Sequence, residues 1–315
     1  MTTQTIPVLD LQDFTGNSKE KADQFVRDLG EALHQIGFFA LVNHNVAPKT
    51  IQDAYNASEA FFALPEKTKA QYEVASLKGQ RGFTQFGKEH AKDSDAPDLK
   101  EFWHVGRETT TERVISYPDN IWPREVPQFC PVMTALFEQL ETCAHHLMSA
   151  CAQYLQQPAD FFSTQVKEGQ TILRIIHYPP VKSEDAPKSQ RAAPHEDINL
   201  ITLLCEATTP GLELLNADGE WLPIEPIPGQ IIVDTGDMLQ ALSNGLLKST
   251  THRVVNPSSS RDRRFSMPFF VHPRPDFDLT PLPNSIEQTG GKARYPSATA
   301  AEALEKRLRE IGLIS

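Results

Sequence analysis

The stretch His195-Glu196-Asp197-Ile198-Asn199-Leu200-Ile201-Thr202-Leu203-Leu204-Cys205 sets two potential metal ligands directly before an apolar run of strand length. Similar short runs, separated by proline and glycine turns, recur through the second half of the chain. They cover residues 171–177, 199–205, 212–215, 221–224, 230–233, 238–242, 252–255 and 265–271. Asp218-Gly219 and Pro228-Gly229 fall between runs and are typical of turns. Short strands at this spacing predict a sandwich or jelly-roll barrel.

Helical patterns surround this β-rich region. Apolar residues recur at helical spacing in several segments, which predicts amphipathic helices there. These segments are 19–36, 48–65, 128–156 and 298–311, and two short strands are expected at 6–11 and 38–42. Residues 66–123 have the character of loops. The predicted fold class is α+β, mainly β, with a double-stranded β-helix (jelly-roll) core and flanking helices.

The expected organisation is one integrated domain with two regions. Residues 1–120 form an N-terminal mixed α/β region that packs on the core. Residues 121–315 form the catalytic jelly roll together with the long helix and the C-terminal helix. At 315 residues this is a large unit, but barrels and sandwiches reach this scale.

Composition excludes several classes of function. The net charge of −11 argues against a nucleic-acid surface, which needs a basic stripe. No apolar run approaches the roughly 20 residues that span a bilayer, and residues 1–5 lack the features of a secretory signal. The four cysteines show no CxxC spacing, which favours reduced thiols and a cytoplasmic location. The oligomeric state stays open.

Two histidines and one carboxylate form a candidate metal site. His195 and Asp197 are two residues apart, and strand side chains alternate, so both are expected to point the same way. His252 follows 57 residues later (252 − 195 = 57), far enough to arrive on another strand. Two histidines and one carboxylate on one face of iron(II) leave positions open for substrate and dioxygen. Zinc also accepts these ligands, but it has no redox chemistry.

A second constellation lies twelve residues beyond His252 (264 − 252 = 12). Arg264 and Ser266 begin the last apolar run and share one strand face, so both could point into the barrel. A guanidinium holds a carboxylate through two parallel hydrogen bonds, and a hydroxyl can add a third. The pair is a plausible anchor for the far carboxylate of a dicarboxylic cosubstrate.

The sequence resembles the isopenicillin N synthase-like 2-oxoglutarate/iron(II)-dependent dioxygenases over nearly its whole length. An ordered set of motifs carries the resemblance. It comprises Gly37-Phe38-Phe39, Asn43-His44, Phe61-Phe62-Ala63-Leu64-Pro65, Asp98-Leu99-Lys100-Glu101, His195-Glu196-Asp197, Gly211-Leu212-Glu213-Leu214, Gly236-Asp237-Met238-Leu239, Thr250-Thr251-His252-Arg253-Val254 and Arg264-Phe265-Ser266-Met267-Pro268. The resemblance implies iron at His195, Asp197 and His252.

The same resemblance implies that Arg264 and Ser266 bind the distal carboxylate of 2-oxoglutarate and that Tyr178 adds a hydrogen bond. The sequence departs from the family pattern at two positions. Ile176 and Asp234 stand where the family often has asparagine. Asp234 is interpreted as structural.

The substrate pocket is less defined. Phe270 lies four residues after Ser266 on the same face, and His104 belongs to the aromatic segment Glu101-Phe102-Trp103-His104. Both are expected to contact substrate. The loops of residues 79–110 and the C-terminal helix are expected to shape the mouth of the pocket.

The resulting hypothesis is an oxygenase that uses iron(II), 2-oxoglutarate and dioxygen. It would oxidise a C–H bond of a small organic substrate by hydroxylation, desaturation or cyclisation, with release of succinate and carbon dioxide. Three alternatives remain open. One is an iron oxidase or oxidative cyclase of the same family that does not need 2-oxoglutarate, and another is a non-enzymatic ligand-binding jelly roll. The third is a zinc site at the same three residues. The partner would be a small molecule rather than a nucleic acid or a membrane.

Overall fold

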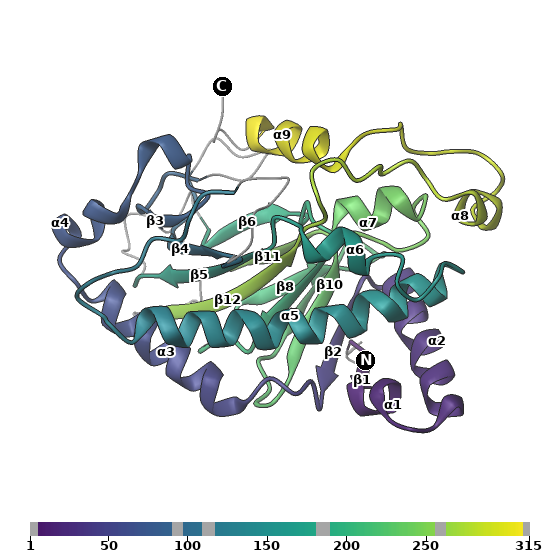
Figure 1. Cartoon of the computed structure of the whole chain (residues 1–315), viewed down its shortest axis with the longest axis horizontal. Helices are drawn as coiled ribbons and strands as arrows, with labels where there is room; N and C mark the ends of the chain where they lie inside the picture. The colour runs from purple at the N-terminus through teal and green to yellow at the C-terminus, as the bar shows by residue number, and fades with distance from the viewer. Residues whose placement is uncertain (1–5, 90–96, 109–116, 181–189, 256–262, 311–315) are drawn as a thin grey trace.

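Two β-sheets form the core of the chain in a computed structural model that describes residues 6–89, 97–108, 117–180, 190–255 and 263–310 (Figure 1). The eight-stranded sheet has the order β1-β2-β10-β7-β12-β5-β4-β3, and the four-stranded sheet has the order β6-β11-β8-β9. The larger sheet contains β1 (Val8–Asp10), β2 (Phe38–Val42), β3 (Gly82–Thr84), β4 (Glu101–Gly106), β5 (Ile172–Tyr178), β7 (Ile201–Cys205), β10 (Ile231–Thr235) and β12 (Arg264–Val271). The smaller sheet contains β6 (Ala192–His195), β8 (Leu212–Leu215), β9 (Trp221–Ile224) and β11 (His252–Val254).

The two sheets share an apolar layer, in which Phe38 and Ile232 of the larger sheet pack with Leu212 and Leu214 of the smaller one. Burial of these side chains holds the sheets against each other. The predicted jelly-roll core with flanking helices is therefore confirmed. The strands of the N-terminal region join the same large sheet, since β2 pairs with β10 and β4 pairs with β5.

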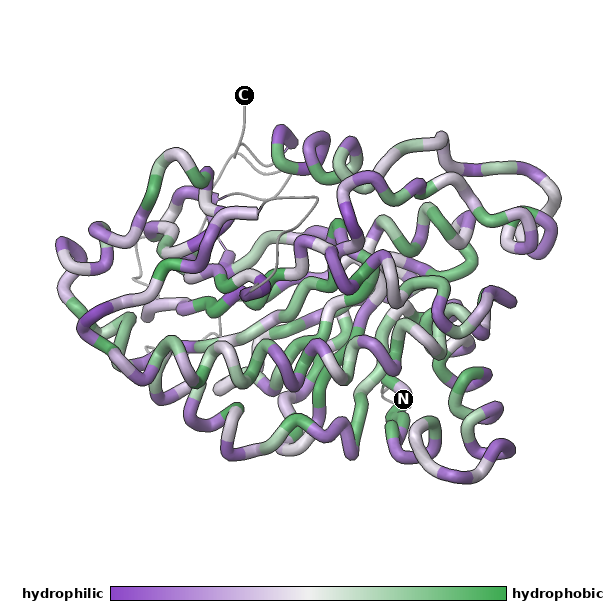
Figure 2. The backbone as a smooth tube through the Cα atoms, in the orientation of Figure 1, coloured by the Kyte–Doolittle hydropathy of each residue, from purple (hydrophilic) through white to green (hydrophobic). Residues whose placement is uncertain are grey.

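Helices flank the larger sheet. The long helix α5 (Phe129–Tyr154) runs across it in Figure 1, beside α3 (Pro48–Phe62). Figure 2 shows a hydrophobic stripe on α5, and Met133, Leu136 and Leu140 in that stripe are fully buried. The other helices are α1 (Leu11–Thr15), α2 (Lys19–Gln35), α4 (Glu66–Lys69), α6 (Ser163–Lys167), α7 (Asp237–Leu242), α8 (Pro283–Gln288) and α9 (Ala300–Glu310), with short 3-10 turns η1 (Ala70–Tyr72) and η2 (Ala75–Leu77).

Three details of the sequence prediction were wrong. The run 238–242 is not a strand but most of helix α7. Met238, Leu239 and Leu242 are its buried residues, a helical spacing that a short apolar run cannot reveal. Residues 66–123 contain the fully buried strand β4. Strand β6 also escaped prediction, because it is only four residues long and contains Pro194.

All four cysteines are free thiols, and burial raises the pKa of Cys143, Cys151 and Cys205 to about 12. These three thiols are therefore protonated and poorly reactive at neutral pH.

Within the described ranges, no helix combines the length and the apolar character that crossing a membrane requires.

Candidate active site

The three predicted metal ligands converge. His195 ends β6, His252 begins β11, and one potential ligand atom from each of His195, Asp197 and His252 lies within 4.8 Å of the other two. The Nε2 atoms of His195 and His252 lie 3.9 and 3.8 Å from Oδ1 of Asp197. Asp197 itself lies in the loop after β6, not on the strand, so strand alternation is not what brings it to the histidines.

Backbone carbonyls fix how the two imidazoles face. Nδ1 of His195 lies 2.8 Å from the Ala193 carbonyl, and Nδ1 of His252 lies 3.2 Å from the Thr250 carbonyl. A carbonyl only accepts, so each Nδ1 carries the proton and donates it. Each Nε2 then presents a lone pair toward Asp197, which is the tautomer that a metal-binding histidine needs.

The electrostatics of the triad also suit a cation. Burial and the neighbouring His252 lower the pKa of His195 to about 4, so its imidazole is neutral. Burial alone would raise the pKa of Asp197, but His252, His195 and the Thr202 hydroxyl hold it below its ordinary value. The hydroxyl of Thr202 donates to Oδ2 of this carboxylate, which leaves Oδ1 toward the histidines.

Arg264 lines a cavity of about 70 Å³ between the two sheets, which the three metal-ligand candidates also line. We call this the inner cavity. Arg264 is 1% exposed, and its Nε donates to the Thr209 carbonyl at 3.1 Å. Its Nη1 is buried and has no hydrogen-bond partner among the described residues. No described carboxylate forms an ion pair with this guanidinium, so an anionic ligand would satisfy it.

The other two residues expected at this anchor lie beside it. Ser266 and Tyr178 line the inner cavity with Arg264. Tyr178 is directly opposite Arg264 in the β5–β12 register, and its ring centroid is 5.0 Å from the guanidinium carbon. Burial lowers the pKa of Arg264, and Tyr178 opposes this effect.

Asp234 also lines the inner cavity, opposite Thr202 in the β7–β10 register. Burial, and then the nearby Asp197, raise its pKa well above the ordinary range. Its environment therefore favours the neutral carboxyl over the carboxylate.

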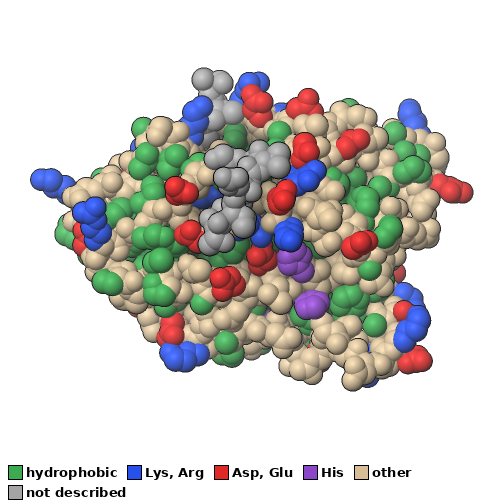
Figure 3. All heavy atoms as spheres, in the orientation of Figure 1, with side chains coloured by type: hydrophobic (Ala, Val, Ile, Leu, Met, Phe, Trp, Pro, Cys, Tyr) green, Lys and Arg blue, Asp and Glu red, His purple; other side chains and the backbone are tan. Residues whose placement is uncertain are grey.

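An outer cavity of about 160 Å³ opens on the other side of the triad. Figure 3 shows histidine, basic and acidic side chains gathered near the middle of one face of the molecule. Phe270 lines both cavities, and His104 lines the outer one. The structure thus places both expected substrate-contacting residues beside the metal-ligand candidates.

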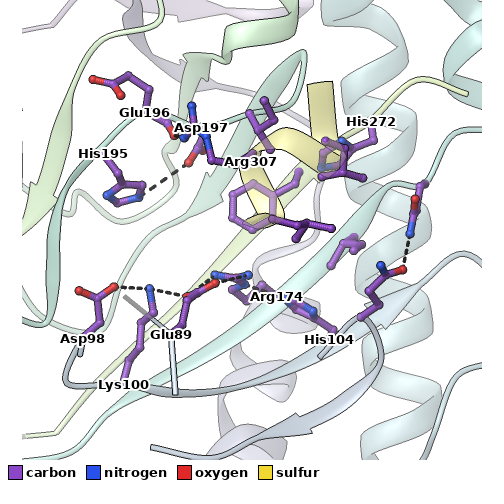
Figure 4. A pocket seen from close by; sticks show the side chains of 17 residues that line it. Glu89, Asp98, Lys100, His104, Arg174, His195, Glu196, Asp197, His272 and Arg307 are labelled. Atoms are coloured by element: carbon purple, nitrogen blue, oxygen red, sulfur yellow. Dashed lines mark hydrogen bonds and ion pairs between the residues drawn. The ribbon is translucent and has the colours of Figure 1, made fainter. Parts of the chain in front are cut away.

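A row of charged side chains forms one wall of the outer cavity, opposite His195 and Asp197 (Figure 4). Lys100 Nζ lies 2.8 Å from Asp98 and 2.7 Å from Glu89. Arg174 meets both oxygens of Glu89 through Nη1 and Nη2, each at 3.1 Å. Its Nε donates to Nε2 of His104 at 2.6 Å. We call Glu89, Asp98, Lys100, Arg174 and His104 the charged wall.

The C-terminal helix closes another side of the outer cavity. Leu304, Arg307 and Leu308 of α9 line it. Arg307 donates through Nη1 to the Glu196 carbonyl at 2.8 Å and through Nη2 to the Asp237 carboxylate. Because Glu196 stands between His195 and Asp197, the helix is tied directly to the loop that carries the metal-ligand candidates.

The donor set fits iron(II). Two ligand atoms that are each about 2.1 Å from one ion can be separated by up to about 4 Å, which the distances from Asp197 to the two histidines satisfy. Two imidazoles and one carboxylate leave further coordination positions open, and the guanidinium of Arg264, which has no ion-pair partner among the described residues, lies in the same cavity. Fold and site together define a non-haem iron oxygenase of the jelly-roll class.

Comparisons with known proteins agree with this class. The family model described as 2OG-Fe(II) oxygenase superfamily matches residues 169–273. The model described as non-haem dioxygenase in morphine synthesis N-terminal matches residues 6–125. A 2-oxoglutarate-Fe(II) type oxidoreductase of Aspergillus fumigatus is 29% identical over 97% of this chain and 93% of its own length.

Solved structures match over almost the full length. A 2OG-Fe(II) oxygenase family protein from Caulobacter crescentus is 39% identical, with a TM-score of 0.86, over 98% of this chain and 99% of that one. A full-length Neurospora crassa protein, solved in complex with alpha-KG, is 28% identical with a TM-score of 0.86 and covers 98% and 97% of the two chains. The chain therefore belongs to the 2-oxoglutarate–iron(II) oxygenase family. It is an oxidoreductase that uses iron(II), 2-oxoglutarate and dioxygen to oxidise a small organic molecule.

Sequence reasoning missed most of the charged wall. Arg174 had one usable signal, because it lies four residues before Tyr178 and therefore on the same face of β5. Lys100 and Asp98 belong to a motif that carries the family resemblance, but the sequence alone does not mark them as cavity residues. Glu89 had no signal, because folding alone brings Lys100 and Arg174 to it. The broader expectation that residues 79–110 and the C-terminal helix shape the pocket is met by the lining of the outer cavity.

Proposed function

We propose that His195, Asp197 and His252 hold the iron of this oxygenase, and that Arg264, Ser266 and Tyr178 hold the distal end of 2-oxoglutarate. The observation that carries the proposal is the inner cavity, which contains the triad and a buried guanidinium without an anionic partner. When bound, iron(II) with 2-oxoglutarate and dioxygen supplies the oxidising power that removes hydrogen from an unactivated C–H bond.

The protein's own residues orient the reactants and exclude water. Thr202 keeps one oxygen of Asp197 occupied, while the carbonyls of Ala193 and Thr250 hold the imidazoles in place. Arg264 and Tyr178 fix the cosubstrate in the inner cavity. Phe270 lines both this cavity and the outer one, where substrate would bind near His104. A site assembled by fixed groups needs little reorganisation during the reaction.

Binding of iron(II) and the requirement for 2-oxoglutarate separate this function from its alternatives. Under anaerobic conditions, 2-oxoglutarate added to the iron(II)-loaded protein should develop a visible charge-transfer band, and admission of air should then yield succinate. An oxidase that does not use 2-oxoglutarate would bind iron without developing the band. A non-enzymatic jelly roll would bind no iron. Either result would overturn the proposal.

The proposal also covers the domain organisation, the cellular location and the class of partner. Residues 1–120 and 121–315 act as one unit, supported by the strands that both contribute to the large sheet. The enzyme works in the cytoplasm on a small molecule, not on a nucleic acid or at a membrane. The acidic net charge and the reduced cysteines support this assignment.

A further inference from the structure

The outer cavity has an unusual balance of charge. Lys100 and Arg174 contribute two positive charges to its charged wall, and Glu89 and Asp98 contribute two negative ones. The side chains of Lys100, Glu89 and Asp98 are 5–7% exposed, so these ion pairs are shielded from water. Buried pairs of this kind strongly resist losing a partner.

The remaining described charges at the outer cavity also leave no lining cation without a carboxylate partner. Arg307 is paired with Asp237, and Glu196 accepts a hydrogen bond from the Thr251 hydroxyl. Among the described residues that line this cavity, every cation is therefore opposed by a carboxylate. The inner cavity differs, because no described carboxylate pairs with Arg264. The described residues thus offer an anion site on the cosubstrate side and none on the substrate side.

Both nitrogens of His104 are also committed. Nδ1 lies 2.6 Å from the Gly79 carbonyl and must donate to it, while Nε2 accepts from Arg174. His104 is therefore a positioning residue that holds the Arg174 guanidinium against Glu89. The rings of Phe102 and Phe270 lie 4.3 and 5.4 Å from the same guanidinium carbon and restrict it further.

Uncharged groups remain available to a ligand. Nε2 of Gln170 donates to Oε1 of Gln80 at 2.6 Å. No described hydrogen bond uses Oε1 of Gln170 or Nε2 of Gln80, so the pair presents one acceptor and one donor at the cavity lining. The imidazole of His272 also lines the cavity, and burial lowers its pKa to about 4. It therefore adds a neutral donor and acceptor. This set complements an amide, which carries both a carbonyl and an N–H group.

We propose that the outer cavity takes an uncharged substrate with amide-type groups, and that Glu89 sets this preference by neutralising Arg174 and Lys100. The inference rests on the proposed function, because it needs the outer cavity to be the substrate side of the iron site. Glu89 becomes a specificity-determining residue. A carboxylate substrate would have to displace Glu89 from two cations at once, which costs more than the new contacts return.

The test uses the full-length protein loaded with iron(II) and 2-oxoglutarate under anaerobic conditions, so that binding is measured without turnover. Calorimetric titrations compare phenylacetamide with phenylacetate and with 2-phenylethylamine. They also compare thymine, which is bound in one structure of the Neurospora crassa relative, with 5-carboxyuracil. In at least one set the neutral compound should bind about tenfold more tightly than its charged counterparts, the scale of one unfavourable buried charge.

Variants of the charged wall then test the assigned cause. Glu89→Gln should strengthen binding of the carboxylate by about tenfold and weaken the preference for the amide. Adding Lys100→Met to that variant should restore the preference, because the charge is again balanced. Glu59→Gln on the exposed side of α3 changes the net charge equally and should behave like wild type. If Glu89→Gln does not fold, Asp98→Asn applies the same test through Lys100.

The outcomes distinguish this inference from the proposed function. If, in both sets, a charged compound binds the wild-type protein as tightly as its neutral counterpart or more tightly, the inference is overturned. Failure of every neutral probe to bind, or an unchanged preference in folded Glu89→Gln, would overturn it too. Affinity for 2-oxoglutarate, measured separately, depends on Arg264 and not on Glu89. A protein that binds 2-oxoglutarate but shows no preference for neutral probes would therefore refute the substrate class alone.

Discussion

His195 and His252 are directly opposite each other in the β6–β11 register, and their ring centroids are 4.4 Å apart. Two adjacent strands that lie far apart in the sequence therefore place two imidazoles side by side. The loop after β6 then brings Asp197 to both. This cross-strand pair is the structural basis of the proposed iron site.

Removal of His252 should abolish tight iron binding. Changes to residues that only support a metal ligand cost about 10- to 100-fold in affinity, so His252→Ala should cost at least that much. Iron content after dialysis against a weak chelator measures the effect. His146→Ala on α5 is the matched control, because it removes an imidazole outside both cavities. Wild-type iron content in His252→Ala would contradict the assignment.

Arg264 should determine the affinity for 2-oxoglutarate. A charge-assisted hydrogen bond contributes roughly 1.5–3 kcal/mol, so Arg264→Met should raise the KM for 2-oxoglutarate by about 10- to 100-fold. Arg264→Lys should recover little of this loss, since an ammonium cannot form the two parallel bonds of a guanidinium. The neighbouring exposed Arg263 supplies the control Arg263→Met. A KM that responds equally to both Met variants would exclude a specific anchor.

Arg307 should fasten helix α9 over the outer cavity. Its two charge-assisted bonds, to the Glu196 carbonyl and to Asp237, are lost in Arg307→Met. Docking of the helix should weaken by about 1–3 kcal/mol, so that limited proteolysis cleaves the C-terminal segment faster. Arg309→Met removes only an exposed pair with Glu305 and should be cleaved at the wild-type rate. Equal cleavage rates for the two variants would show that Arg307 does not hold helix α9 in place.

The buried His272 should make stability depend on pH. Burial lowers its pKa from 6.5 to about 4, so the unfolded chain binds more protons than the folded one between these values. The stabilisation is therefore present above about pH 6.5 and is lost as the pH falls toward 4. His272→Gln should reduce the loss of unfolding free energy between pH 7 and 5, measured with urea on metal-free protein. An unchanged loss would place the sensitivity elsewhere, for example at His195, whose pKa is lowered in the same direction.

The sequence predicted the parts of the fold that repeat regularly. The strand 38–42 and the helices over 48–62 and 129–154 occur where the apolar spacing indicates them. The errors arose where tertiary contacts, and not local apolar spacing, determine the secondary structure. Strand β4 contains Glu101 and His104, which resemble loop residues until their buried partners are known, and Glu101 pairs with Lys69 at 2.7 Å. Charged residues can occupy a central strand only when such partners are present.

The site also has features that the sequence predicts and features that appear only after folding. The ligand candidates and the anchor at Arg264 could be recognised from residue type and spacing. The reason for the convergence of Asp197 was wrong, because a turn and not a strand places it. The charged wall joins β4, β5 and the segment around Glu89, and its balance exists only after folding. Substrate class was therefore beyond sequence reasoning, whereas cosubstrate class was not.

The most direct measurement is anomalous diffraction at the iron edge from crystals grown anaerobically with iron(II) and 2-oxoglutarate. We expect one peak between Nε2 of His195, Nε2 of His252 and Oδ1 of Asp197, with a carboxylate of 2-oxoglutarate on the guanidinium of Arg264. An iron peak elsewhere, or 2-oxoglutarate bound away from Arg264, would contradict the account.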